Sequence, residues 1–155
     1  MLHGVIKKIP LGIALLFVAA QFVRPAKNIS AGAAPADIGT KFAVPPNVKS
    51  LLLRACYDCH SNQTHYPWYA DIQPVGWWLA SHVKDGKEHL NFSEFGTYTV
   101  KRTVSKLGQI SDEVSQQSMP LPSYTWAHPE ARLTAAEMKL ITDWADNLHD
   151  EIAPE

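Results

Sequence analysis

Apolar residues recur at the spacing of an α-helix in four parts of the chain, and nowhere do they alternate convincingly as in a β-strand. The first helix is expected to begin at Asn47, a capping residue after two prolines, and to run into Cys56. Its apolar face consists of Val48, Leu51, Leu52 and Ala55. The second helix is expected to open at Pro74 and to end near Gly86. Its shared face consists of Val75, Trp78, Leu79 and His82.

The other two helices are predicted in the second half of the chain. Residues 98–118 contain an apolar stripe with spacings of three and four: Val100, Val104, Leu107, Ile110 and Val114. The prolines of residues 119–122 must end this helix, because proline cannot continue it. The last helix is signalled by Thr134 and Glu137, the two positions of a capping box. Its buried stripe is expected to consist of Met138, Ile141, Ala145 and Leu148, with Trp144 alongside. The pattern therefore predicts an all-α domain with long loops.

The N-terminal residues 1–23 form a hydrophobic segment unlike the rest of the chain. Lys7 and Lys8 precede an uncharged run, residues 9–23, which is typical of an export signal. The run is shorter than the roughly 20 apolar residues of a comfortable transmembrane span, and residues 18–20 make an imperfect cleavage site. We favour an uncleaved anchor over a cleaved signal, with a buried helix of a cytosolic domain as the third interpretation. Either export interpretation predicts that the remainder lies in the periplasm, anchored to the inner membrane or secreted.

The remaining bulk features define the domains and exclude one class of partner. Residues 24–46 contain several prolines and glycines with little periodicity, which predicts an extended linker that wraps the domain. The chain is thus divided into a signal or anchor at 1–23, a linker at 24–46 and a domain at 47–150. The formal net charge is −1 and no basic cluster is present, which argues against nucleic acid as a partner.

The two cysteines fall in one short motif, Cys56-Tyr57-Asp58-Cys59-His60. This is the C-x-x-C-H pattern of c-type haem attachment. Two thiols at this spacing reach the two vinyl groups of one haem, and the histidine that follows serves as the proximal axial ligand of the iron. The rival interpretation is a C-x-x-C redox pair, which usually lies near a βαβ pattern that this sequence lacks. One covalently attached haem c is therefore expected.

Met119 is the expected distal axial ligand. It stands at the start of a proline-rich loop, whereas Met138 lies on an apolar helix face and Met1 is the initiator. A methionine paired with histidine is a standard ligand set of cytochromes c. The competing interpretation is that Met119 only packs at the helix end. His128 is the leading substitute as ligand and His82 the next.

Several motifs, in order, resemble one known family. The pieces are residues 56–62, Tyr66-Pro67-Trp68-Tyr69, Pro74-Val75, Trp77-Trp78, Gly86, residues 91–94, Met119-Pro120, Tyr124, His128-Pro129 and Leu133-Thr134. Together they resemble the bacterial single-haem "haem-binding domain" family, a branch of the c-type cytochromes, across residues 56–144. Phe95 departs from the expected Trp. The resemblance implies a cytochrome c-like helical fold and haem binding, but no assigned reaction.

These features predict a monohaem cytochrome that passes single electrons between redox partner proteins. The first alternative is a peroxidase-like enzyme with an open sixth coordination position and His82 or His128 as acid and base. The second is a sensor that binds a small gas at the open iron. The axial ligand on the distal side of the iron distinguishes these functions.

Overall fold

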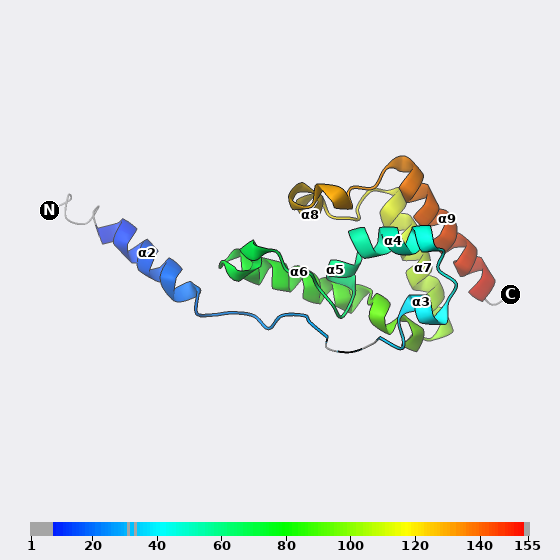
Figure 1. Ribbon diagram of the computed structural model, residues 1–155, viewed down its shortest axis with the longest axis horizontal. Coiled ribbons are helices and arrows are strands. Elements are labelled where there is room, and N and C mark those ends of the chain that lie inside the picture. The colour runs from blue at the N-terminus through cyan, green and yellow to red at the C-terminus, as the bar shows by residue number, and fades with distance from the viewer. Residues whose placement is uncertain (1–7, 31, 33, 154–155) are drawn as a thin grey trace.

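The computed structural model describes residues 8–30, 32 and 34–153, and within these ranges every regular element is a helix. After α2 (Lys8–Ala20), the helices are α3 (Ile38–Lys41), α4 (Pro46–Ala55), α5 (Tyr57–His60), η1 (Trp68–Asp71), α6 (Val75–His89), η2 (Phe92–Thr97), α7 (Val100–Ser115), α8 (Pro122–Ala127), η3 (Pro129–Ala131) and α9 (Ala135–Ile152). α2 projects from one end, and the other helices gather in a single body (Figure 1). The expected all-α fold is confirmed for the described residues.

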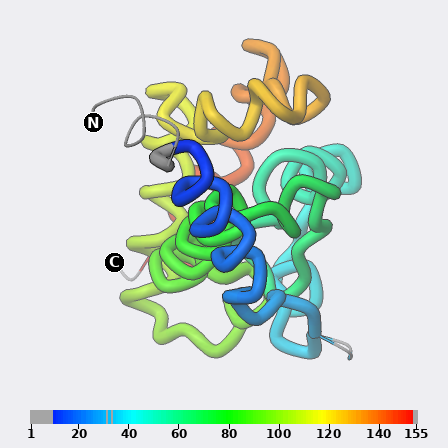
Figure 2. The backbone as a smooth tube through the Cα atoms, turned by 90° about the vertical axis from the view of Figure 1, so that its left-hand side faces the viewer, coloured from blue at the N-terminus to red at the C-terminus, as the bar shows by residue number. Residues whose placement is uncertain are grey.

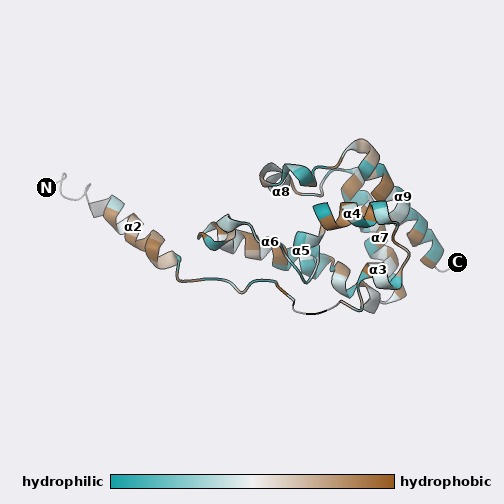
Figure 3. Cartoon of the chain, viewed as in Figure 1, coloured by the Kyte–Doolittle hydropathy of each residue, from teal (hydrophilic) through white to brown (hydrophobic). Residues whose placement is uncertain are grey.

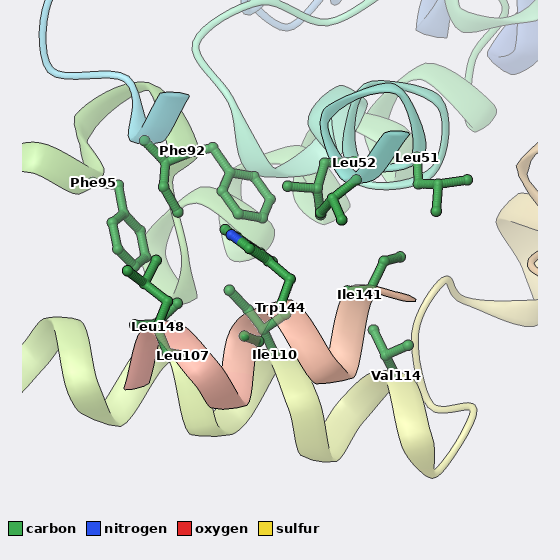
Figure 4. Close-up of a cluster of buried hydrophobic side chains, with 13 residues drawn as sticks. Leu51, Leu52, Phe92, Phe95, Leu107, Ile110, Val114, Ile141, Trp144 and Leu148 are labelled. Carbon is green, nitrogen blue, oxygen red and sulfur yellow. The ribbon is translucent and has the colours of Figure 1, made fainter. Parts of the chain in front are cut away.

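The hydrophobic core lies between α7, α9 and the elements that cover this pair. The facing side chains are Leu107, Ile110 and Val114 from α7 and Ile141, Trp144 and Leu148 from α9 (Figure 4). Leu51 and Leu52 of α4 and the two phenylalanines of η2 complete the cluster. The Trp144 indole N–H donates to the Ala43 carbonyl at 3.1 Å, which satisfies the polar atom of this large buried side chain.

Two of the four expected helices are present nearly as predicted. In α4, all four residues of the expected apolar face are buried. The helix begins one residue before Asn47, at Pro46, because proline suits the first turn of a helix. At the start of α9, the Thr134 hydroxyl accepts from the Glu137 N–H at 3.3 Å, and the Glu137 carboxylate accepts from the Thr134 N–H at 2.8 Å. The predicted capping box is therefore confirmed.

The third expected helix is shorter than predicted at both ends. α7 begins at Val100, after the Thr99 hydroxyl accepts from the Arg102 N–H at 3.3 Å, and ends at Ser115. Leu107, Ile110 and Val114 are buried as expected. Val100 is 56% exposed, however, and Thr103 takes the buried position of that turn. Val104 is only half-buried. The predicted stripe is therefore correct from Leu107 onward, whereas Val100 is exposed because the start of the helix has not yet reached the core.

The predicted end and the predicted buried face of α6 are both wrong. The helix continues past Gly86 to His89. Its buried residues are Gly76 and Val83, whereas Val75 and Trp78 of the expected face are exposed. Gly86 lies inside the helix because another segment approaches its Cα closely, as described below, and not because the helix stops there.

The described residues of the stretch 24–46, which exclude 31 and 33, form part of the folded body. The backbone of this stretch runs along the loop after α5, where the Ser30 N–H donates to the Asn62 carbonyl and the Thr64 N–H to the Asn28 carbonyl, each at 3.0 Å. The expected wrapping therefore agrees with the structure. The expectation of a wholly extended linker is wrong at α3, because Ile38 is buried in the core.

α2 carries apolar side chains that are exposed to solvent along its length, and hydropathy colouring shows this helix as mostly apolar (Figure 3). Its exposed residues include Leu11, Ile13, Leu15, Leu16, Phe17 and Val18. No helix in the described part of the chain is long and apolar enough to cross a membrane. Lys7 of the expected basic region lies outside the described residues.

Candidate functional site

The C-x-x-C-H motif folds as one tight turn directly after α4. The Cys56 N–H donates to the Leu52 carbonyl at 2.9 Å, so Cys56 ends that helix. The Cys56 carbonyl then accepts from the N–H groups of Cys59 and His60, at 3.2 and 3.0 Å, and these bonds close the single turn of α5. Residues three and four positions apart in a helical turn share one side. The turn therefore places both thiols and the imidazole on the same wall.

His60 is held in the state that binds a metal ion. Its Nδ1 lies 3.1 Å from the carbonyl oxygen of Leu90, at the end of α6. When Nδ1 donates to a backbone carbonyl, Nε2 is the nitrogen left for a metal. Burial lowers the pKa of His60, which keeps the ring neutral.

Gly86 allows α5 to lie directly against α6. A Cβ atom at this position would be 2.7 Å from the Cys59 carbonyl oxygen and 3.2 Å from the Cys59 Cβ. Any larger side chain would push the cysteine turn away from the helix. The glycine that the sequence suggested as a helix end thus sets the position of the second thiol.

A cavity of about 400 Å³ lies beside this turn, and its lining is predominantly apolar. Its walls come from α4, α5, α6, α7 and the loop of residues 119–121. Cys56, Cys59, His60 and Met119 all line it. The structure therefore brings Met119 to the same cavity as the motif, although 59 residues separate it from His60 in the sequence.

The loop that carries Met119 is fixed at both ends. After α7, Gln117 adopts a left-handed conformation with φ of 59°, and the N–H groups of Ser118 and Met119 both donate to the Glu113 carbonyl, at 3.0 and 3.1 Å. Beyond the loop, the Tyr124 hydroxyl of α8 donates to Asp58 at 2.8 Å. Met119 is thus held from the end of α7 on one side and from the cysteine turn on the other.

The histidines that compete with Met119 differ in their positions. His128 is not among the residues that line the cavity. Its ring stacks on Tyr124 with centroids 4.6 Å apart, and its Nε2 lies 3.0 Å from the Tyr69 hydroxyl. His82 does line the cavity, and so does His89, another of the histidines that the sequence offers as competitors of Met119. Of the two named substitutes, only His82 faces the same space as the motif.

Several other residues of the site carried no clear sequence signal. Asp58 occupies a variable position of the motif, and only the structure joins it to Tyr124. Lys106 and Gln109 line the cavity from the polar side of α7 and bond to each other at 2.7 Å. Their pattern in the sequence is that of a solvated helix face, so nothing there marked them as part of a site.

The two thiols lack the properties of a redox-active pair. The pKa of Cys56 is raised to about 12, first by burial and then by the neighbouring Cys59. The pKa of Cys59 is raised to about 11, first by burial and then by the neighbouring Asp58. Thiols of catalytic C-x-x-C pairs have lowered pKa values, because the thiolate is the nucleophile. The environment of this turn therefore argues against thiol–disulfide exchange.

The sequence of the chain agrees with one family model. The model of the haem-binding domain family matches residues 15–147. The chain belongs to this family. No curated protein and no solved structure matches it. The residues of the cavity fit the cofactor of a haem-binding domain, because an apolar cavity lined by two thiols, a neutral imidazole and a thioether offers the chemical groups that hold a haem.

Proposed function

We propose that this haem-binding domain carries one c-type haem, attached through Cys56 and Cys59, and transfers single electrons on the periplasmic side of the membrane. The observation that carries the proposal is the common cavity. Both thiols, the His60 imidazole and the Met119 thioether line it, although they come from two distant parts of the sequence. Thiols three positions apart and followed at once by histidine are the pattern of c-type haem attachment.

Each of these residues has one task in holding the cofactor. Cys56 and Cys59 would form thioethers with its two vinyl groups, and neutral His60 would bind the iron from one side. Met119 would supply a sulfur ligand from the other side, while the apolar side chains of α4 and α7 exclude water. When bound, haem supplies an iron centre that alternates between the ferrous and ferric states.

The alternative function is enzymatic and rests on His82. This residue lines the same cavity, and its Nδ1 lies 2.9 Å from the Trp78 carbonyl, which leaves Nε2 for proton transfer. If no side chain bound the distal side of the iron, the protein would act as a peroxidase-like enzyme or bind a small gas. The Met119 thioether on the cavity wall favours electron transfer, because histidine and methionine together are a standard ligand set of cytochromes c.

The proposed location rests on the N-terminal segment. A basic pair followed by an uncharged apolar run is typical of export. The family match begins at residue 15, inside α2, and cleavage at the weak site of residues 18–20 would remove part of the matched sequence. We therefore propose an uncleaved anchor in the inner membrane. The expected partners are redox proteins that meet a surface of low net charge, −1 for the whole chain.

The decisive experiment is a pyridine spectrum of protein produced with its export segment and with the haem-attachment machinery. A c-type spectrum that stays with the chain after acid and solvent extraction is expected. Cys56→Ala and Cys59→Ala should each leave one thioether and shift the pyridine spectrum, and the double variant should lose all covalent haem. Extraction of the haem from the unaltered chain would disprove covalent attachment.

The distal ligand requires a separate test. Met119→Ala should convert a low-spin, six-coordinate ferric spectrum into a high-spin or water-ligated one. The reduction potential should fall, because a methionine ligand raises it. Met138→Ala is the matched control, since Met138 packs against the core from α9 and does not line the cavity. An unchanged spectrum in the Met119 variant would exclude Met119 as a ligand and direct the search to His82.

A further inference from the structure

Four of the five tryptophans of the chain are exposed. The exposed fractions are 77% for Trp68, 40% for Trp77, 47% for Trp78 and 81% for Trp126. Only Trp144 is buried, in the core. An indole exposed to water leaves apolar surface unburied, which a small protein normally avoids. Several such indoles close together therefore indicate a surface that binds another molecule.

The exposed tryptophans belong to elements that meet at one end of the molecule. Trp68 lies in η1, which directly precedes the first turn of α6, where Trp77 and Trp78 lie. Trp126 lies in α8, and the hydrogen bond between Tyr69 and His128 joins η1 to the end of α8. This is the end from which α2 projects (Figure 1). We call these four residues the tryptophan end.

The residues that directly follow α2 are attached to the body beside the tryptophan end by specific polar contacts. The Gln21 side chain donates to the Gln73 carbonyl at 3.2 Å and accepts from the Gln73 N–H at 2.9 Å. The Trp77 indole N–H donates to the Val23 carbonyl at 2.7 Å. Viewed from this end, α2 passes in front of the body, with α8 at the upper edge (Figure 2). The apolar helix therefore projects from the same end of the molecule as the elements that carry the exposed tryptophans.

We propose that α2 and the tryptophan end together bind a phospholipid bilayer, with α2 in the lipid and the four indoles at the level of the headgroups. Tryptophan is enriched at that level because its ring is apolar and its N–H is polar. α2 is the argument for lipid over a protein partner, since its apolar side chains are exposed on every face and a single protein groove would cover only one.

The charges near this surface suit a neutral bilayer. Lys27 and Asp71 form an ion pair with each other at 2.9 Å, so they add no net charge there, and Arg24, whose side chain donates to the Gln21 carbonyl at 3.2 Å, adds one positive charge. Binding is therefore expected to depend on apolar burial more than on anionic lipids. The inference rests on the proposed membrane location, but it makes no use of the haem or its ligands.

The surface can be mapped with spin labels on the full-length holoprotein bound to phosphatidylcholine vesicles. If both native thiols are thioethers, an introduced cysteine is the only thiol that reacts. Labels are placed by Trp68→Cys and Trp126→Cys, and the control is Asp146→Cys, an exposed position on α9. α9 lies at the opposite end of the molecule from α2 (Figure 1).

On vesicles, the labels at positions 68 and 126 should collide several-fold more often with oxygen and several-fold less often with a water-soluble nickel complex. The label at position 146 should not change. Labels at 68 and 126 that stay accessible to nickel would overturn the proposal, as would labels shielded from both reagents, which indicate a protein contact. Labelling of the unaltered chain would instead contradict covalent haem attachment, and the measurement would then be repeated in the Cys56→Ala/Cys59→Ala background.

Discussion

At the scale of single residues, Asp58 connects the two halves of the site. It lies between the cysteines, and its carboxylate accepts from the His65 N–H at 3.1 Å and from the Tyr124 hydroxyl at 2.8 Å. Burial and the nearby Asp58 raise the pKa of Tyr124, so the phenol keeps its proton and remains the donor. A position that the motif leaves free thus holds the segment that follows Met119 against the cysteine turn.

Tyr124→Phe should loosen the loop of Met119. Loss of this charge-assisted bond is expected to lower the free energy of unfolding by about 1.5–3 kcal/mol. It should also let an added ligand such as imidazole displace Met119 more readily from the ferric protein. Tyr66→Phe is the control, since its hydroxyl accepts from the Asn28 N–H at 2.8 Å in another part of the molecule. Denaturant unfolding and imidazole titration test both variants.

The control removes a hydrogen bond between neutral groups, so it should lose a smaller amount of stability, about 0.5–1.5 kcal/mol, with no change in imidazole affinity. If both variants bound imidazole alike, Asp58 and Tyr124 would have no special role in positioning the loop.

At the scale of elements, the contact between α5 and α6 decides where the second thiol lies. The contact depends on Gly86, because a Cβ there would meet the backbone of Cys59. Glycine inside a helix costs about 0.5–1 kcal/mol relative to alanine. The helix tolerates that cost at a position where a larger residue would separate the two elements.

Gly86→Ala should therefore destabilise the protein, although alanine is the better helix former. Overpacking typically costs about 1–3 kcal/mol and should exceed the gain in helix propensity. Gly108→Ala is the matched control in α7, where the nearest atom to an added Cβ would be 3.9 Å away. The control should gain up to about 1 kcal/mol. Thermal unfolding of both variants and the yield of covalent haem test this prediction. A Gly86→Ala variant more stable than the unaltered protein would contradict it.

Glu137 links the start of α9 to α4 and makes this junction sensitive to acid. Its pKa falls from the ordinary 4.5 to about 2, mainly because its carboxylate accepts from the Thr134 N–H and then because it pairs with Arg54 at 2.7 Å. A lowered carboxyl pKa stabilises the fold fully above about 4.5, and this contribution is lost as the pH falls towards 2.

Glu137→Gln should accordingly lower the free energy of unfolding at pH 7. Near pH 2 the variant and the unaltered protein should have almost the same free energy of unfolding. Asp143→Asn, which removes only an exposed pair with Lys139 inside α9, should change stability little at either pH. Urea titrations at several pH values provide the comparison. If the free energy of unfolding of Glu137→Gln stayed below that of the unaltered protein by the same amount down to pH 2, the charge of Glu137 would not be the cause of the lost stability.

The elements that the sequence predicted well are those that bury a single apolar stripe in the core. α4 and α9 are such helices, and α7 departs only before Leu107. α6 was misread because Gly76 and Val83 pack on the body while Trp78 and His82 face outward or line the cavity. Periodicity cannot tell which of two partly apolar faces is buried. The short helices η1, η2 and η3 are too brief to show any period.

The candidate site, too, could be predicted only in part from the sequence. Its local half, the cysteine turn with His60, follows from five consecutive residues. Its distal half depends on contacts between distant segments, so the sequence alone left Met119 in competition with His128. Only the folded chain shows that His128 bonds to Tyr69 and that Met119 lines the cavity.

At the scale of the whole molecule, the domain has two parts that depend differently on the cofactor. α7 and α9 bury their apolar stripes against each other (Figure 4). α5, α6 and the segment of residues 119–127 lie around an apolar cavity of about 400 Å³, to which α4 and α7 also contribute walls. When the cavity is empty, α7 keeps its packing against α9, whereas α5, α6 and this segment have no such stripe to hold them. A cavity of that size leaves its walls without packing partners unless a ligand fills it. The first part should therefore stay folded when the second loosens.

Hydrogen exchange of a haem-free Cys56→Ala/Cys59→Ala variant tests this division. Amides of α7 and α9 should stay protected, whereas those of α6 and residues 119–127 should exchange faster than in the holoprotein, because local stability follows local packing. The cysteine-containing chain produced without haem controls for the substitutions themselves. Loss of protection throughout would mean that the helices form one cooperative unit that needs the cofactor to fold. Protection retained throughout would mean that the cavity walls are rigid without it, and that the haem enters a preformed site.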